Sequence, residues 1–346
     1  MNCRRFSLRL STPLSTAAGQ IKRRDGFVVR FDHRGEGGIG EAAPLPGWTE
    51  SLDECEQALE TALETYADDG HTAALLELDA GEVPAARNGF ATALLDADAR
   101  ADGISLTEWF DPDARSGSVP VNATVGDDTV EETVEAARTA VADGFDCLKR
   151  KVGVGSLDAD LDRVDAVRDA VGPDVTLRVD ANGAWERTTA ADAVDRLADY
   201  DVSYVEQPLP ADDLAGHADL RGRGVEIALD ESLRAHTAAE VLDSDAADVL
   251  VLKPMVVGGP GNAHTLAMRA RESGIEPVMT TTIDGAIARA AAVHVAAAIP
   301  AVRPCGLATA SYLDDDLIDD PVPVADGRIS VPDGPGLGID PDEVSP

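Results

Sequence analysis

The feature that most constrains the fold is a regular alternation between residues 118 and 307. Short apolar runs recur there, and amphipathic stretches with helical spacing separate them. Alternating strands and helices build a parallel sheet. The eight runs predict closure into a TIM-like (β/α)7β barrel, and they read VPVNATV, CLKRKV, VTLRVDA, VSYVEQP, EIALDES, DVLVLKP, EPVMTTT and RPCGL. The alternative is an open doubly wound sheet, which is disfavoured because no GxGxxG or phosphate loop follows any run.

The first hundred residues have a different pattern. FSLRL and GFVVRF predict strands of a small antiparallel sheet, and GIGEAAPLPGW predicts a Gly/Pro-rich loop. Residues 51–68 and 84–102 have the Leu and Ala spacing of helices. We therefore predict an α+β capping domain over 1–115, completed by 308–346, and a barrel domain over 118–307.

Five successive strand runs end on an ionisable side chain: Lys151, Asp180, Glu206, Asp230 and Lys253. Each is separated from the next by about one strand–helix unit. In a parallel barrel the carboxyl ends of all strands open onto one face, which holds the active site. We therefore expect these five side chains to converge. Taken singly, each is more simply a solvated loop start or a helix cap.

Three carboxylates at one barrel mouth repel one another unless a cation lies between them. Ligation by Asp180, Glu206 and Asp230 would be all-oxygen, which suits Mg²⁺, with Mn²⁺ as the second candidate. No His or Cys stands among the strand ends in a zinc pattern. Lys151 precedes the carboxylates and Lys253 follows them, so the two lysines should face each other across the metal.

The charge balance limits the partners. The chain has 64 Asp+Glu against 29 Lys+Arg, a net charge of -35, and the acids are spread between apolar residues. Such a surface repels nucleic acid and anionic membranes, so neither is an expected partner. We interpret the acidity as halophilic, an adaptation to a high-salt cytoplasm where charges are screened; an ordinary acidic protein is the alternative.

Lysine is nearly absent from this chain. Only Lys22, Lys149, Lys151 and Lys253 occur, and every other Lys/Arg position is Arg. Three of the four lysines therefore lie in the strand-end group. Neither a signal peptide nor an apolar run as long as a membrane span is visible, so the expected location is cytoplasmic.

The ordered motifs LKRKVG, LRVDANGAW, VEQPLP, LDES and VLKP resemble those of the enolase superfamily, in its muconate-lactonizing subgroup. GEAAPLPGWTESLDE is similar to the capping-domain loop of that family, and AARNGFATALLDADARADG to its N-terminal helix. The resemblance covers nearly the whole chain. It implies metal-dependent proton abstraction next to the carboxylate of a small-molecule substrate, and it leaves assembly into homo-oligomers open.

The resemblance also implies roles. Lys151 removes the proton and then protonates the leaving hydroxide; Lys253 stabilises the enediolate from the other side, or acts as the second base of a racemase. Further expected contacts, to the substrate or around the metal, are Lys149, Asn182, Glu231, Trp48 in a lid over 44–48, and Thr281. The alternative is that these residues have only structural roles, as loop starts, helix caps, a contact that joins the domains, or buried strand residues.

Within the subgroup, GEAAPLPGW and CGLATASYLDDDL most resemble the o-succinylbenzoate synthase family. That family dehydrates a succinyl-hydroxycyclohexadiene carboxylate in menaquinone biosynthesis, which would make this chain a lyase. Dipeptide epimerases carry Asp-x-Asp near the eighth strand, whereas GLATAS (306–311) has no acid. N-acylamino acid racemases and muconate-type cycloisomerases remain alternatives, because they share every catalytic residue. A non-catalytic protein is disfavoured by the retention of all five strand-end groups.

Overall fold

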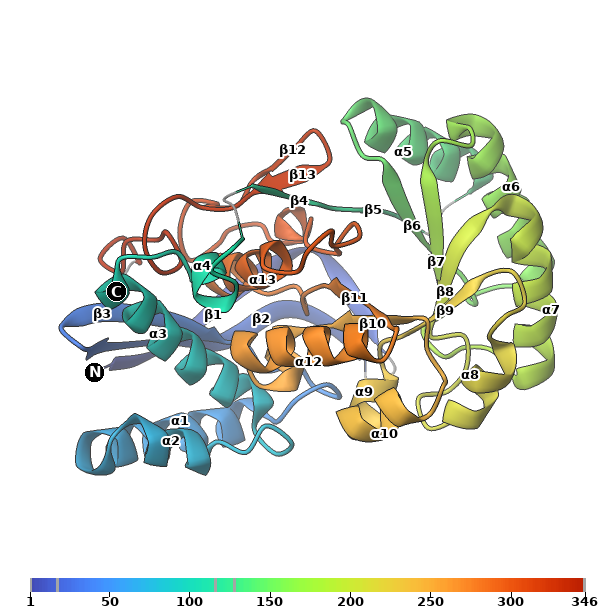
Figure 1. Cartoon of the computed structure of the whole chain (residues 1–346). Helices are drawn as coiled ribbons and strands as arrows, with labels where there is room; N and C mark the ends of the chain where they lie inside the picture. Colours follow the sequence, from blue (N-terminus) through green and yellow to red (C-terminus); the bar gives the residue numbers. More distant parts are fainter. Residues whose placement is uncertain (1, 17–18, 115–116, 127–128, 345–346) are drawn as a thin grey trace.

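The computed structural model describes residues 2–16, 19–114, 117–126 and 129–344 (Figure 1). An antiparallel sheet with its helices forms one side of the molecule, and a curled parallel sheet with its helices forms the other. One hydrophobic core runs through both parts, from Phe6 to Val344. No helix in the described residues is both long and apolar enough to cross a bilayer.

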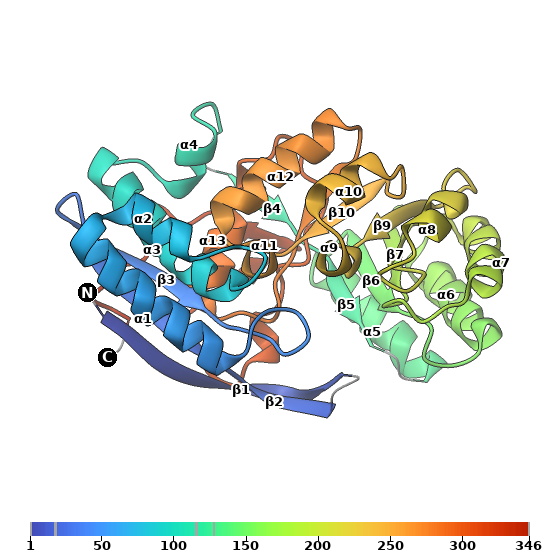
Figure 2. The ribbon, with the colours of Figure 1, turned by 90° about the horizontal axis from the view of Figure 1, so that it is seen from below.

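The N-terminal sheet has the order β1-β2-β3, with strands β1 (Asn2–Thr16), β2 (Gly19–His33) and β3 (Glu36–Ala42). Its helices are α1 (Leu52–Asp69), α2 (His71–Glu77), α3 (Pro84–Asp102) and α4 (Leu106–Phe110). Helix α1 begins at a capping box, in which Ser51 and Glu54 satisfy each other's backbone N–H groups. Helices α1 and α3 confirm the two predicted helices. Figure 2 shows the long β1–β2 ribbon along one flank, with α1 and α2 near it.

Strand β3 corrects the sequence interpretation, which assigned its residues from Gly38 to a loop. Gly38 and Gly40 lie against helix α3, and a Cβ on either would meet a backbone oxygen of that helix at 2.0 Å. The glycines are there because strand and helix approach closely, not because the chain turns. The true loop begins after Ala42.

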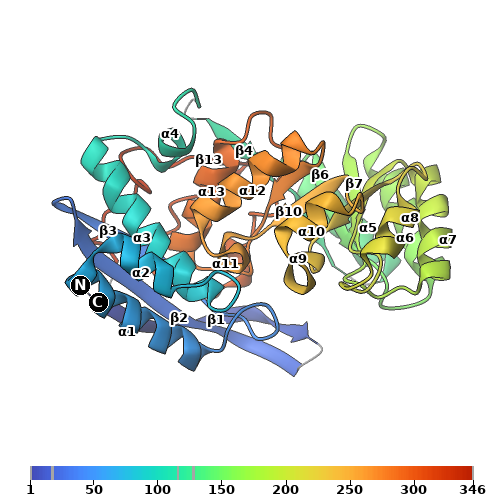
Figure 3. The same cartoon turned by 60° about the horizontal axis from the view of Figure 1, so that its bottom comes forward.

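The barrel sheet contains seven parallel strands in the order β11-β10-β9-β8-β7-β6-β5. Its strands are β5 (Ala123–Val125), β6 (Cys147–Lys151), β7 (Thr176–Asp180), β8 (Val202–Glu206), β9 (Glu226–Leu229), β10 (Val249–Leu252) and β11 (Glu276–Met279). The helices between and after them are α5 (Val130–Ala142), α6 (Leu157–Val171), α7 (Arg187–Leu197), α8 (Leu214–Leu220), α9 (Ser232–Ala235), α10 (Ala238–Asp243), α11 (Pro254–Val257), α12 (Pro260–Glu272) and α13 (Ala286–Ala297). Figure 3 shows α9 to α12 lying between the N-terminal helices and α5 to α8.

The two edges of this sheet are joined by a short segment in the eighth position. Cys305 forms a parallel bridge to Val121, and Gly306 forms one to Thr280. These residues belong to the run RPCGL, which was expected as the eighth strand. The structure therefore confirms the predicted fold class, a TIM-like barrel with an α+β N-terminal part, although its last strand is reduced to two bridges.

The first predicted barrel strand, VPVNATV, is divided in the structure. Strand β4 (Ser118–Pro120) pairs antiparallel with β13 (Arg328–Ser330), which in turn pairs with β12 (Val324–Ala325). Only β5 joins the barrel sheet. Pro120 has no N–H to donate, so the single run does not sustain one continuous ladder.

The C-terminal segment returns to the N-terminal part. Leu106 N donates to Gly336 O and Gly336 N donates to Ile104 O, both at 2.8 Å. Leu313 bridges Leu10 on β1. These contacts agree with the expected return, while the exact domain limits, 1–115 and 118–307, stay a prediction.

Candidate active site

The strand-end side chains come from adjacent strands of the barrel. Lys151, Asp180 and Glu206 are the last residues of β6, β7 and β8, and they stand opposite one another in the sheet register. Asp230 follows β9 directly and Lys253 follows β10 directly. Because parallel strands end on one face, all five lie around one barrel mouth.

Lys149 connects two of the carboxylates. Its Nζ lies 2.8 Å from Asp180 Oδ2 and 2.6 Å from Glu206 Oε1. Burial disfavours the charged ammonium, but the two carboxylates outweigh burial and raise the pKa of Lys149 well above its usual value. Lys149 therefore stays protonated and acts as an internal counter-ion.

In the described part of the chain, three strand-end carboxylates at the mouth share only two lysines that contact them, Lys149 and Lys253. Burial, followed by repulsion from Asp180, raises the pKa of Glu206 to about 7. Burial also raises the pKa of Asp230 to about 6, although Lys253 opposes the shift. Burial acts the same way on Asp180, but Lys149 overcomes it and lowers the Asp180 pKa. A further positive charge would relieve this crowding.

The mouth contains a second ion pair beneath an aromatic ring. Lys253 Nζ forms a hydrogen-bonded ion pair with Asp230 Oδ1. The same ammonium lies 4.2 Å from the centre of the Trp48 ring, a cation–π contact. Trp48 belongs to the loop after β3, so the segment expected as a lid reaches a strand-end lysine. Arg234 fixes that loop by donating to Gly47 O.

Lys151 belongs to a third set of contacts and is exposed. Its Nζ donates to Asn182 Oδ1 at 3.0 Å, and Asn182 Nδ2 donates to Glu231 Oε1 at 3.1 Å. Asn182 has a φ of 45°, the left-handed region that asparagine tolerates better than most residues. The expected neighbour Asn182 thus contacts Lys151 directly, and Glu231 is connected to the strand-end group through Asn182.

Thr281 follows β11 and is buried. Its Oγ1 lies 3.1 Å from Thr309 Oγ1 and accepts a hydrogen bond from Ile283 N. This arrangement matches the structural alternative, and the substrate contact expected for Thr281 stays a prediction.

The residues at the mouth fit a divalent metal by their chemistry. Asp180, Glu206 and Asp230 offer only oxygen, from three neighbouring strand ends. Within the described residues no three carboxylate, His or Cys side chains are already gathered as a metal site. Instead Lys149 bonds one oxygen each of Asp180 and Glu206, and Lys253 bonds one oxygen of Asp230.

A hollow of about 600 Å³ lies outside the mouth. It is lined by residues of the loop before α3, of α9 to α10 and of α11 to α12, and also by Trp48 and Arg234. None of the five strand-end residues lines it. Trp48 therefore forms a wall between this hollow and Lys253.

Two buried residues, one beside the mouth and one at the start of the lid loop, had no role in the sequence interpretation. Gln207 follows Glu206, is fully buried and bonds the loop after β9. Arg24, on β2, donates to Ala43 O and Pro44 O at the start of the lid loop. The signal for Gln207 was its place in the VEQPLP motif; Arg24 stood in a run of exposed basic residues and gave none.

Two family models match this sequence. Residues 132–345 match the enolase C-terminal domain-like family, and residues 1–97 match the MenC N-terminal domain. Together they span both parts of the fold.

Individual relatives point to more than one reaction. The chain is 41% identical to o-succinylbenzoate synthase of Thermobifida fusca over 220 residues, 62% of this chain and 67% of the relative. It is 33% identical to o-succinylbenzoate synthase of Thermosynechococcus vestitus over 82% of this chain and 84% of that one. A solved dipeptide epimerase of Enterococcus faecalis V583, complexed with Mg and the dipeptide L-Leu-L-Tyr, has a TM-score of 0.84 and 28% identity, covering 97% of this chain and 98% of that one.

Proposed function

This chain belongs to the enolase superfamily, and on that premise we propose that it is an o-succinylbenzoate synthase. The reaction is the dehydration of a succinyl-hydroxycyclohexadiene carboxylate to an aromatic succinylbenzoate. The match to the MenC N-terminal domain and the two synthase relatives support this choice of substrate.

The observation that favours the synthase over an epimerase is the chemistry of residues 306–311. This segment begins at Gly306, which forms one of the two bridges that close the barrel. It contains no carboxylate, and Thr309 contributes a hydroxyl that contacts Thr281. A substrate ammonium would find no anionic partner in this segment, whereas a substrate without an ammonium needs none.

Asp180, Glu206 and Asp230 are the proposed ligands of Mg²⁺, with Mn²⁺ as a substitute. When bound, the ion would polarise the substrate carboxylate and stabilise the negative charge that develops on its oxygens. Lys149 Nζ lies 2.8 Å from Asp180 Oδ2 and 2.6 Å from Glu206 Oε1. By bonding both oxygens, Lys149 limits the freedom of the two carboxylates before the ion binds.

The two remaining lysines perform the proposed proton chemistry. Lys151, deprotonated, removes the proton next to the substrate carboxylate and then delivers it to the departing hydroxide on the same face, so that water leaves. Lys253 contributes positive charge near the developing anion and exchanges no proton with carbon. The Trp48 ring over Lys253 helps to exclude water from that side.

The second candidate is an N-acylamino acid racemase or dipeptide epimerase. It is favoured by the overall structural likeness to the dipeptide epimerase. In that reaction Lys253 must transfer a proton on the face opposite to Lys151. The two functions therefore differ in what Lys253 does to carbon.

The decisive experiment supplies the cyclohexadiene carboxylate and, separately, both enantiomers of an N-succinyl amino acid in D₂O. We expect wild type to aromatise the first at about 1–10³ s⁻¹. Lys151→Ala and Lys253→Ala should each lose this activity, while Lys22→Ala, the fourth lysine, should retain it. Failure to aromatise, together with α-proton exchange in both enantiomers, would replace the synthase by the racemase.

A further inference from the structure

Gln207 lies behind the carboxylates and has no part in the proton chemistry. We propose that Gln207 is a positioning residue that sets the affinity of the mouth for its divalent cation, by holding the loops that bear Glu206 and Asp230 in fixed register. This inference rests on the proposed metal dependence.

The side-chain amide of Gln207 connects two loops. Its Oε1 accepts from the backbone N–H groups of Asp230 at 3.0 Å and Ser232 at 3.2 Å. Its Nε2 donates to Leu209 O at 3.1 Å and to Ser232 Oγ at 2.9 Å. One buried side chain therefore joins the end of β8 to the turn after β9, at Asp230 and at Ser232.

The backbone of Gln207 makes the same connection. Its N–H donates to Ala228 O on β9 at 2.8 Å, and its carbonyl accepts from Gly183 N at 2.7 Å, in the loop after β7. Its φ of 43° is left-handed, a conformation that a glutamine adopts only where its surroundings impose it. The loops that follow Asp180, Glu206 and Asp230 thus all meet at one residue.

The orientation of the amide follows from its neighbours. His217 Nδ1 is 2.8 Å from Asp213 O and must donate to it, because a carbonyl only accepts. Nε2 of His217 is then an acceptor and faces Leu209 N and Gln207 Nε2, each at 3.3 Å. If the amide were flipped, its NH₂ would oppose two backbone N–H groups. A carboxylate in its place would oppose Leu209 O and add charge beside Asp230.

Because Oε1 of Gln207 accepts and Nε2 donates, substitutions that keep its volume but change these groups distinguish a positioning role from simple filling of space. Gln207→Met keeps the volume but leaves the N–H groups of Asp230 and Ser232 without their partner. Gln207→Glu keeps the shape and the two acceptor bonds but loses the donors. Outer groups that orient metal ligands typically change metal affinity by about 10–100-fold when altered. We expect both variants to weaken Mn²⁺ binding within that range.

The test is titration of the chelator-treated 346-residue chain with Mn²⁺, reading free Mn²⁺ by electron paramagnetic resonance. Gln207→Met and Gln207→Glu should raise the Mn²⁺ Kd about 10–100-fold, and saturating Mn²⁺ should restore most of the activity. Ser232→Ala removes the hydroxyl that contacts Nε2 and Oε1 of Gln207 but leaves both backbone bonds to Oε1, so it should raise the Kd less and serves if the larger changes prevent folding. The matched control is Asn88→Leu, another buried amide that bonds backbone, at Glu41 O, away from the mouth; it should leave the Kd unchanged.

The outcomes separate the two proposals. Wild type that binds neither Mn²⁺ nor Mg²⁺ would remove the proposed metal-dependent function, and this inference with it. Wild type that binds Mn²⁺, with folded Gln207→Met and Ser232→Ala variants of unchanged Kd, would overturn the positioning role alone. An equal rise in Kd for Asn88→Leu would also overturn it, because general loosening would then explain the effect.

Discussion

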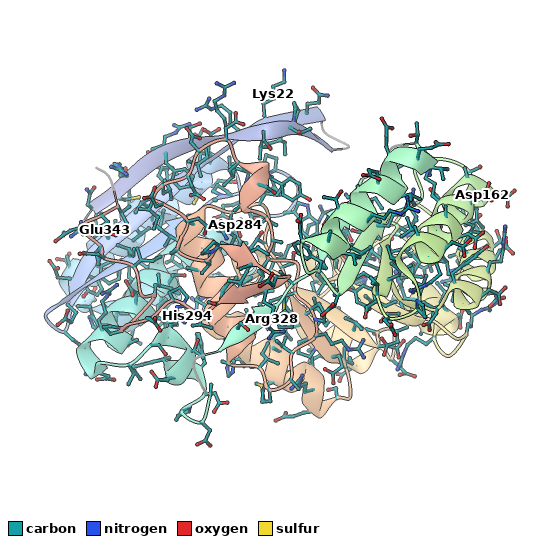
Figure 4. The ribbon with its side chains drawn as sticks, turned by 90° about the horizontal axis from the view of Figure 1, so that it is seen from above. Lys22, Asp162, Asp284, His294, Arg328 and Glu343 are labelled. Carbon is teal, nitrogen blue, oxygen red and sulfur yellow. The ribbon has the colours of Figure 1, made fainter. Side chains whose placement is uncertain are left out.

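The barrel mouth and the junction between the N-terminal sheet and the barrel both bury charged side chains. At the junction these are Arg24 on β2, Glu41 on β3 and Asp284 after β11. Figure 4 shows Asp284 in the interior, between the β1–β2 ribbon and the barrel elements. The two clusters differ in what completes their hydrogen bonding.

Backbone groups complete the junction. Arg24 donates to Ala43 O at 2.6 Å and Pro44 O at 2.9 Å. Glu41 accepts from Gly285 N at 2.7 Å and Ala288 N at 3.0 Å, at the start of helix α13. Burial, followed by repulsion from Asp284 and Asp316, still raises the pKa of Glu41 to about 8. Each of these buried side chains has a fixed partner, so this cluster joins the two parts of the molecule.

The mouth has fewer such partners, because over the residues described only Asp180, of its three strand-end carboxylates, accepts from a backbone group, Asn182 N at 3.0 Å. In the part of the chain that the structure describes, Glu206 Oε atoms receive a hydrogen bond only from Lys149, and Asp230 Oδ atoms only from Lys253. A lysine on a flexible stem can yield an oxygen to another cation, whereas a backbone N–H cannot move away. A buried charge cluster completed by backbone is structural, while one in which Glu206 and Asp230 are held only by lysines remains able to bind a ligand.

The largest expected effect is at the mouth. Asp180→Asn or Asp230→Asn should lower kcat/KM by about 10³-fold or more through lost metal binding. The melting temperature of chelated enzyme should change little, because removing one carboxylate also relieves repulsion. Asp162→Asn, on the outer face of α6 (Figure 4), makes the same chemical change at an exposed site and should retain activity.

Metal removal tests the same property without a mutation. Treatment with EDTA should abolish activity, and Mg²⁺ or Mn²⁺ should restore it. Full activity in thoroughly chelated wild type would contradict the proposed role of the three carboxylates and, with it, the distinction drawn between the clusters.

The junction should show the opposite behaviour, with the loss appearing in stability. Arg24→Met leaves Asp284 without its cation and two buried carbonyls without donors. Breaking a buried ion pair in this way typically costs about 3–5 kcal/mol of unfolding free energy. Denaturant titration measures it, with the exposed neighbour Arg23→Met expected within about 0.5 kcal/mol of wild type. Equal losses for the two variants would refute the structural role.

A buried histidine extends the comparison to pH. His294 in α13 (Figure 4) is bonded to Thr107 and Leu337 O, and burial lowers its pKa from 6.5 to about 4. Below pH 6.5 the unfolded chain binds a proton that the folded chain does not. Stability should therefore fall as pH drops from 6.5 towards 4, by up to about 3 kcal/mol from this group.

The histidine contribution is measured as a difference. Urea midpoints between pH 7 and 4.5 should fall less steeply for His294→Gln than for wild type, whose other titrating groups are unchanged in the variant. Parallel pH profiles for the two proteins would show that His294 is not responsible.

The smallest effect per charge is expected at the surface. Salt screens the exposed charges there, whereas the two buried clusters are not screened. The net charge of -35 predicts that the melting temperature rises from low to molar KCl, since screening relieves self-repulsion. Each exposed charge contributes well under ~1 kcal/mol, so only their sum is visible. Sucrose in place of KCl is the control. A melting temperature that does not respond to KCl would mean that the acidity has another cause.

The sequence predicted the barrel because strand periodicity and strand-end charges are local patterns. It predicted the convergence of Lys151, Asp180, Glu206, Asp230 and Lys253 because topology places strand ends together. It failed at β3, where Gly38 and Gly40 signify close packing on a helix rather than a turn. Glycine alone does not distinguish the two cases.

The junction could not be predicted, because its partners lie far apart in the sequence. Arg24 and Asp284 are separated by 260 positions (284 − 24), and no spacing rule links them. Gln207 lies in the motif VEQPLP, but the prediction of site residues relied on ionisable side chains at strand ends and Gln207 is uncharged. Its role depends on the backbone of residues 230 and 232, which only the folded chain brings near.

The barrel is closed at Cys305 and Gly306 by only two bridges, and this closure is the part of the described barrel wall with the fewest paired residues. The seven strands of the sheet are joined by ladders of two to five residue pairs, whereas this segment is held by three backbone hydrogen bonds, to Pro120, Asn122 and Met279. Local opening costs least where the fewest such bonds must break together. Amide hydrogens of residues 305 and 306 should exchange with solvent before those of β6 to β8. The barrel would then open first along one line, at the start of the segment 306–311 on which the proposed choice of synthase over epimerase rests.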